Sequence, residues 1–233
     1  MARLVINDGS VEALKWLALL LMTGDHVNKY LFNGTVALLF NAGRLALPLF
    51  AFVLGYNLAR PGTLERGVYV RTMRRLATAG VLATPPFIAL GGLAAGWWPL
   101  NVMLTLLVVT AMLYLIDLGG KLRISAATTV FLVAGSCVEY WWLALAICLS
   151  AWCYCRRPSA LAFILLIAAI SALWLINGNF WALGALPLIA LASQVDLQMP
   201  RIRWLFYVFY PLHLIALYLL RGLMSRAGYL FFT

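Results

Sequence analysis

The sequence has few charged or metal-binding side chains. Of its 233 residues only 10% are charged, and it contains seven acidic residues, two histidines and four cysteines. This small polar fraction, together with 65% hydrophobic residues, excludes an ordinary soluble globular domain. A single Cys-x-Cys pair offers too few ligands for a metal, so we expect no metal site and interpret the cysteines as packing residues: Cys137, Cys148, Cys153 and Cys155.

The sequence also lacks the apolar-polar alternation of barrel strands and any hydrophilic stretch long enough for a second domain. Its apolar runs are about 15 to 20 residues long, and only helices or closed barrels span a bilayer. We therefore predict an all-α, polytopic integral membrane helical bundle, a single domain over residues 1–233. About nine transmembrane helices are expected, at 12–31, 35–59, 71–90, 100–117, 124–136, 140–154, 159–176, 180–194 and 204–220.

The formal net charge of +10 at first suggests a nucleic-acid partner. The basic residues, however, are spread over loops and do not gather on one face. Counted on alternate sides of the predicted spans, about 13 Lys and Arg fall on one side and about 3 on the other, and basic loops stay cytoplasmic. We therefore expect a multi-pass membrane protein with a cytoplasmic amino terminus, in contact with lipid and not with nucleic acid.

Two of the predicted helices carry ionisable side chains where hydrocarbon is expected. The segment LKWLALLLMTGDHVNKYL (14–31) contains Asp25, His26 and Asn28, and the next helix contains Arg44. Each ionisable group at bilayer depth costs roughly 2.5 to 3.5 kcal/mol on insertion scales, so a chain that keeps several together usually uses them. We interpret these residues as an intramembrane polar site built on the first two helices.

Helix rise predicts that His26 and Arg44 lie at a similar depth. His26 is about 21 Å along the first helix from Glu12, which places it in the outer half of a 30 Å hydrocarbon core. Arg44 enters from the opposite side, about 14 Å below Thr35, and Asn41 is one turn away on the same face. The two helices are therefore expected to present His26 and Arg44 in one layer.

Lys15 and His26 are separated by 11 residues, which is three helical turns to within about 20 degrees. They share a helix face and lie about 16 Å apart. This distance suits a long, thin ligand with an anionic head near Lys15, Arg74 and Arg75 and a reactive tip near His26.

The roles of the polar residues stay open at this point. His26 is either a general base or a structural hydrogen-bonding residue. Asp25 reaches the imidazole only if the helix is distorted, since neighbouring helical residues point about 100 degrees apart; its alternatives are ion pairs with Lys29 or Arg44. Arg44 could stabilise an oxyanion, hold a carboxylate, or neutralise Asp25.

Three segments together resemble the TraX family of conjugative-pilus proteins, which includes TrbP of IncP plasmids. They are LALLLMTGDHVNKYL, AGRLALPLFAFVLGYNLAR and FYPLHLIAL. The resemblance combines the Asp-His pair of the first helix, Gly-Arg with Pro-Leu-Phe and Gly-x-Asn-Leu in the second, and a histidine in the last. The residues that carry it are Asp25, His26, Asn28, Gly43, Arg44, Pro48, Leu49, Phe50, Gly55, Asn57, Leu58, Tyr210 and His213.

The resemblance implies an acetyltransferase of the bacterial inner membrane that moves acetyl from acetyl-CoA to the amino terminus of a pilin subunit. On this reading His26 is the general base, Arg44 with Asn41 stabilises the oxyanion, and Asp25 orients or compensates charge. Lys15 with His26 also resembles the Arg-x10-His pattern of the membrane acyltransferase-3 superfamily, with Lys in place of Arg. The residues expected to bind substrate are Lys15, Asn28, Asn41, Asn57, Arg71, Arg74, Arg75 and His213.

Two other functions fit the same pattern. A non-enzymatic pilus-assembly factor could hold hydrophobic pilin in the membrane, and a small-solute transporter could use broken helices and midplane charges. Against the transporter, the sequence shows no paired repeat halves. On the outer side, Glu139 and Tyr140 could contact an acceptor, although a solvated loop is the simpler explanation.

Overall fold

The computed structural model describes residues 4–91, 93–202 and 204–229, and within these ranges the fold is helical without a β-strand. The expected all-α class is therefore confirmed. A short π-helix, Val130–Ala134, continues α6, and a 3₁₀ turn, Trp181–Gly184, precedes α10. The α-helices are α1 Asp8–Leu31, α2 Ala37–Gly43, α3 Ala46–Leu58, α4 Val68–Leu90, α5 Val102–Leu118, α6 Lys121–Thr129, α7 Trp141–Arg156, α8 Ala160–Ala172, α9 Trp174–Asn177, α10 Ala185–Ala192 and α11 Leu205–Arg226.

Each predicted span coincides with a helix or a pair of consecutive helices in the described part of the chain. Within that part, three helical segments are both long and apolar enough to cross a membrane: Ala37–Leu58, Ala160–Asn177 and Leu205–Arg226. Val102–Leu118, Trp141–Arg156 and Trp181–Ala192 are apolar but shorter. The helical segmentation thus agrees with the sequence, while the number of nine crossings stays a prediction.

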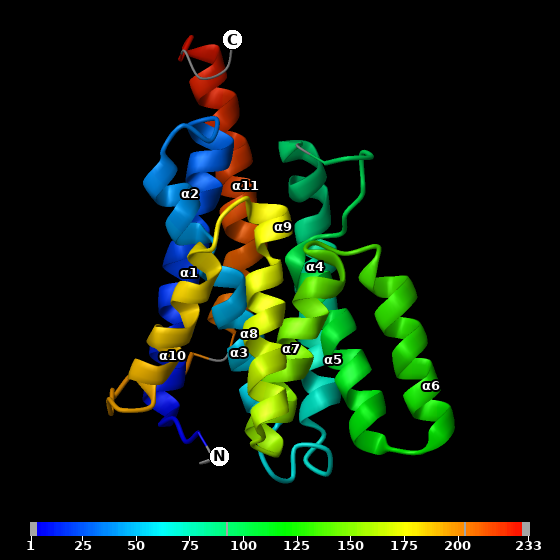
Figure 1. Ribbon diagram of the computed structural model, residues 1–233. Helices are drawn as coiled ribbons and strands as arrows, with labels where there is room; N and C mark the ends of the chain where they lie inside the picture. The colour runs from blue at the N-terminus through cyan, green and yellow to red at the C-terminus, as the bar shows by residue number, and fades with distance from the viewer. Residues whose placement is uncertain (1–3, 92, 203, 230–233) are drawn as a thin grey trace.

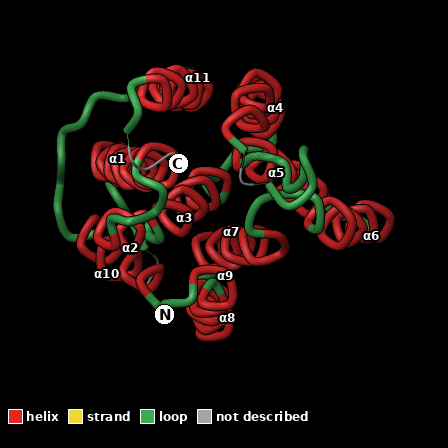
Figure 2. Tube along the Cα trace, turned by 90° about the horizontal axis from the view of Figure 1, so that it is seen from above, coloured by secondary structure: helices red, strands yellow, loops and turns green. Residues whose placement is uncertain are grey.

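The long helices run side by side along one common direction, and the start of α1 and the end of α11 lie at opposite ends of the bundle (Figure 1). Viewed along the helices, α3 occupies the middle, with α1 and α7 on either side of it (Figure 2). Helix α4 packs between α11 and α5, and α6 lies at the periphery, where it contacts α5. Helices far apart in sequence, such as α1 and α11, therefore become neighbours.

The interior consists of two apolar clusters. One surrounds α3, α5 and α7 and includes Leu49, Phe52 and Leu145, each at most 2% exposed. The other lies between α1, α4 and α11 and includes Leu76 and Tyr210. The polar residues singled out in the sequence lie around this second cluster, so the packing of α1 against α11 and α3 decides which of them meet.

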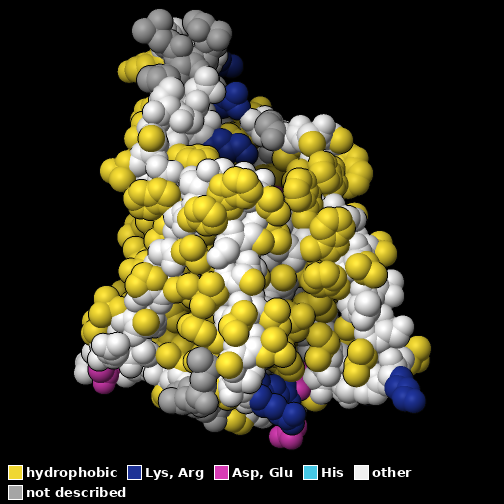
Figure 3. Space-filling model, in the orientation of Figure 1, with side chains coloured by type: hydrophobic (Ala, Val, Ile, Leu, Met, Phe, Trp, Pro, Cys, Tyr) yellow, Lys and Arg dark blue, Asp and Glu magenta, His cyan; other side chains and the backbone are white. Residues whose placement is uncertain are grey.

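The face of the bundle seen in Figure 3 is largely apolar between its two ends. The space-filling view shows hydrophobic side chains over the middle of the molecule and most of the Lys, Arg, Asp and Glu of this face near its ends (Figure 3). Large apolar side chains such as Leu161 and Ile164 of α8 and Leu212 and Leu219 of α11 are more than half exposed. A continuous apolar surface of this kind suits lipid and not water.

Candidate active site

A break between α2 and α3 orients the first group of polar side chains. Pro48 lies in the first turn of α3, where its missing N–H breaks no helical hydrogen bond, but in a continuous helix its ring would clash with the carbonyl of Arg44. Helix α2 accordingly ends at Gly43, and α3 begins at Ala46. The amide of Arg44 donates instead to the carbonyl of Asn41 at 3.1 Å, which forms a tight turn beside α1.

Arg44 and Asp25 form a buried ion pair across this turn. Arg44 Nη2 donates to Asp25 Oδ2, and the two side chains are 11% and 14% exposed. Gly43 permits the close approach of the helices, because a Cβ at that position would collide with the Asp25 side chain. Of the alternatives that the sequence left open, the structure thus shows Asp25 paired with Arg44, so the two charges compensate each other.

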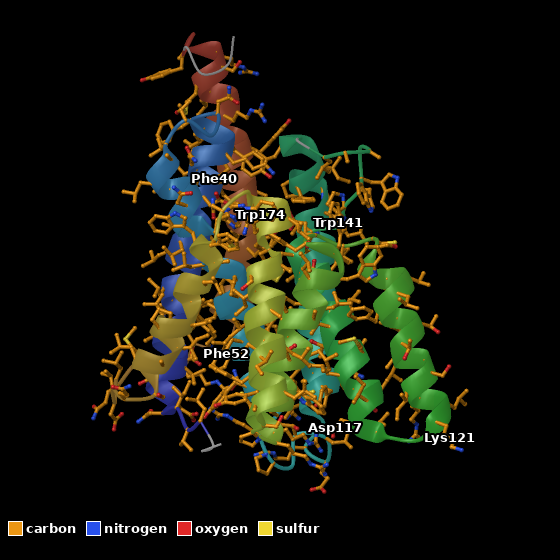
Figure 4. The ribbon with its side chains drawn as sticks, viewed as in Figure 1. Phe40, Phe52, Asp117, Lys121, Trp141 and Trp174 are labelled. Atoms are coloured by element: carbon orange, nitrogen blue, oxygen red, sulfur yellow. The ribbon has the colours of Figure 1, made fainter. Side chains whose placement is uncertain are left out.

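The remaining donors of Arg44 are also engaged. Nε donates to the carbonyl of Phe40 at 3.1 Å, and the guanidinium carbon lies 4.3 Å from the centre of the Phe40 ring. Nη1 makes the longest contact, 3.4 Å to Oδ1 of Asn177 at the end of α9. Figure 4 labels Phe40 on α2 and Trp174 on α9, the two helices that border this group. The Nη1 donor is the one held least firmly.

Two asparagines that sequence reasoning missed complete this network. Asn179 Nδ2 donates to Oδ1 of Asn41 at 3.1 Å and to the carbonyl of Asn177 at 3.3 Å. The segment Ile-Asn-Gly-Asn between two apolar runs was the available signal in the sequence. Asn41 therefore lies one turn from Arg44 as predicted, but its side-chain oxygen is bonded to the α9 end of the site.

His26, the residue after Asp25, meets the last helix. Its Nδ1 is 2.7 Å from Nε2 of His213 on α11. The ring centroids are 5.0 Å apart and the planes differ by 10°, which is the arrangement of two rings meeting edge to edge through their nitrogens. The edges of Tyr30 and Tyr210 lie close to the His26 ring, with centroids at 5.8 and 6.4 Å. The predicted catalytic histidine and the histidine of the last helix thus form one unit.

Asn28 has a structural task in the turn that follows α1. Its side-chain oxygen accepts from the amide of Val36 at 2.9 Å, and its carbonyl accepts from the amides of Phe32 and Gly34. Gly34 has a φ of 73°, the left-handed conformation that commonly ends a helix. Asn28 is 1% exposed. Asn28, one of the residues predicted to bind substrate, thus stabilises the connection between α1 and α2.

A cavity of about 530 Å³ opens near the amino-terminal end of α1, a size typical of small-molecule sites. Six basic residues line it, together with Asn57 and several apolar side chains. The basic residues are Lys15, Arg60, Arg66, Arg71, Arg75 and Arg201. Lys15 is also paired with the carboxylate of Glu12 at 2.6 Å.

The structure thus brings together Lys15, Asn57, Arg71 and Arg75 of the predicted binding residues. Arg74 is exposed and is not among the residues that line the cavity. The inner wall contains Leu76, Met103 and Leu106, which pack in the same apolar cluster as Met22, one turn before His26. His26 itself is not in the cavity wall, so apolar side chains separate the basic cavity from the histidine pair.

Comparison with known proteins agrees with this arrangement of motifs. A family model described as TraX protein matches residues 10–221. Protein TraX of Escherichia coli is 30% identical over 227 residues, which covers 92% of this chain and 88% of that protein. No solved structure matches. The chain therefore belongs to the TraX family.

Proposed function

We propose that this protein is an acetyltransferase of the bacterial inner membrane that transfers acetyl from acetyl-CoA to the amino terminus of a conjugative pilin. The observation that carries this proposal is the basic cavity lined by Lys15, a residue of α1 that lies three helical turns before His26. Lys15 and His26 share a helix face about 16 Å apart. This geometry supports a donor with an anionic head and a long, thin arm.

In this proposal the cavity binds the donor through its charge and shape. Arg71 and Arg75, with Lys15, contact the phosphates, since guanidinium groups pair with phosphate through two parallel hydrogen bonds. The apolar inner wall then accepts the pantetheine arm. Opening a path to His26 requires movement of side chains of the apolar cluster such as Met22, whose unbranched thioether chain adapts easily.

At the reacting end, His26 accepts the proton of the attacking amine and Arg44 stabilises the oxyanion of the tetrahedral intermediate. The Nη1 donor of Arg44 is the one we assign to this task, because its contact with Asn177 is the longest of the guanidinium. Asp25 keeps the guanidinium charge compensated in the absence of substrate. Asn41, one turn away, supports the same group.

The test is acetyl transfer by purified protein from labelled acetyl-CoA to a synthetic pilin amino terminus. We expect His26→Ala to lower turnover by roughly 100-fold or more, the usual contribution of a general base. Lys29→Ala is the matched control, since Lys29 is an exposed residue of the same turn. Unchanged turnover in His26→Ala would overturn the base assignment. Pilin of unchanged mass in cells that express this chain would favour a non-enzymatic assembly factor.

A further inference from the structure

The hydrogen bonds around the two histidines define where their protons lie. Nδ1 of His213 is 3.2 Å from the carbonyl oxygen of Phe209, one turn earlier in α11. A carbonyl only accepts, so His213 Nδ1 carries a hydrogen. His213 is 8% exposed and contacts no carboxylate in the described part of the chain, and burial favours an uncharged ring in such a place. Its Nε2 is therefore an acceptor.

This acceptor fixes the tautomer of His26. Nε2 of His213 lies 2.7 Å from Nδ1 of His26, so His26 Nδ1 must donate. A neutral imidazole has one N–H, which leaves the lone pair on Nε2 of His26. That nitrogen makes no hydrogen bond to any described residue, and His26 stays partly exposed. A general base needs a free lone pair directed at its substrate, and this chain of hydrogen bonds supplies it.

The same contacts fix the orientation of both rings. The near-coplanar meeting of His26 and His213 restricts rotation of His26 about its side-chain bonds. His213 in turn lies parallel to the Phe209 ring, with centroids 5.2 Å apart and planes 9° apart. A carboxylate often orients a basic histidine in this way. Here Asp25 is bound to Arg44 and lies on another face of α1, so it does not fill that position.

From this geometry we infer that His213 is the positioning residue of His26, which it holds in the Nδ1–H tautomer with Nε2 free. The inference rests on the proposed transferase function for its chemical meaning, while the tautomer itself is a property of the resting protein. In this inference His213 acts by orienting His26 and does not itself contact the substrate.

In the proposed reaction, acetyl transfer takes place through a tetrahedral intermediate. The amine nitrogen forms a bond to the thioester carbonyl carbon while Nε2 of His26 takes the amine proton. The tetrahedral intermediate collapses, the carbon–sulfur bond breaks, and the imidazolium returns a proton to the leaving sulfur. The products are an amide and a free thiol. Between these steps the positive charge on His26 is stabilised by the hydrogen bond from Nδ1 to the neutral His213.

Histidine NMR tests the tautomer independently of activity. The sequence contains two histidines, so protein labelled with nitrogen-15 histidine and purified through a histidine-free tag gives two ring systems. We expect a protonated Nδ1 and an unprotonated Nε2 in His26 of the native protein. In His213→Leu the two tautomers of His26 should become mixed. A proton on Nε2 in the native protein, or an unchanged His26 spectrum in His213→Leu, would overturn the inference.

Kinetics then test the functional role. We expect His213→Leu to lower kcat by roughly 100-fold, and His213→Gln, whose amide oxygen can still accept from His26 Nδ1, to recover most of that loss. KM for acetyl-CoA should stay the same in both variants, because His213 does not line the basic cavity. Full activity in His213→Leu would reject the positioning role. If the native protein transfers no acetyl, the proposed function fails, and the NMR result still decides the tautomer.

Discussion

The buried charges of Asp25 and Arg44 should stabilise the fold only as a pair. The pair joins α1 to the turn between α2 and α3, and its side chains are 14% and 11% exposed. Asp25→Asn leaves the buried guanidinium of Arg44 without a counter-charge, and Arg44→Gln leaves the buried carboxylate of Asp25 without one. The double variant removes both charges and places two amides that can bond to each other.

Removing one partner of a buried ion pair costs about 3 to 5 kcal/mol, whereas removing both together costs much less. For a chain of this length, 1 kcal/mol shifts Tm by about 2 to 4 °C, so each single variant should lose about 6 to 20 °C. The loss of unfolding free energy in the double variant should be smaller than the sum of the two single losses by at least about 2 kcal/mol. The pair would then be shown to act as one unit.

The matched control is the pair between Asp8 and Arg60. Its nitrogen and oxygen are 2.6 Å apart, but the side chains are 68% and 31% exposed. Exposed pairs of this kind contribute at most about 1 kcal/mol. Thermal unfolding in detergent, followed by the fluorescence of the nine tryptophans, measures all variants. The reasoning is refuted if Asp25→Asn costs no more than Asp8→Asn, or if the losses at Asp25 and Arg44 simply add.

Two further predictions concern the cavity and the packing of the central helices. Arg71→Gln and Arg75→Gln should each weaken coenzyme A binding about tenfold, because each removes a charge-assisted contact; titration calorimetry at two salt concentrations measures the effect. Arg74→Gln is the control, since Arg74 does not line the cavity, and it should leave binding unchanged. An equal loss in Arg74→Gln would show that the cavity is not the binding site. Gly55→Ala should destabilise the protein by about 1 to 3 kcal/mol in thermal unfolding, since the new Cβ meets the backbone of α7 at 2.9 Å. Gly222→Ala, with nothing within 4 Å, should be neutral or slightly stabilising, and similar losses at both glycines would contradict this account.

The helical nature of the chain and the positions of its polar residues were predictable because they depend on local properties. The apolar runs and the three-turn spacing of Lys15 and His26 follow from hydropathy and helix geometry. The ion pair of Asp25 with Arg44 was among the alternatives that this reasoning produced. Choosing it over Lys29 required knowing how α1 and α2 are rotated about their own axes.

The contribution of distant residues was not predictable in this way. Asn177 joins Arg44 from 133 positions away, and Arg201 joins the basic cavity beside Lys15. Arg74, which the sequence grouped with Arg71 and Arg75, does not line that cavity. Asn177 and Arg201 come from segments far along the chain from Arg44 and Lys15, so their places in the site depend on how distant segments pack together, which no local pattern of the sequence shows.

The sequence by itself determined that this protein is an apolar, all-helical chain with Asp25 and His26 on the first helix and Arg44 on the next, because hydropathy and helical periodicity are properties of the chain near each residue. Only the tertiary structure decided that His26 meets His213, 187 positions later, and that Asp25 does not orient it. The physical reason is that a histidine can take its partner from any neighbouring helix, and only the packing of α1 against α11 places one within hydrogen-bonding distance.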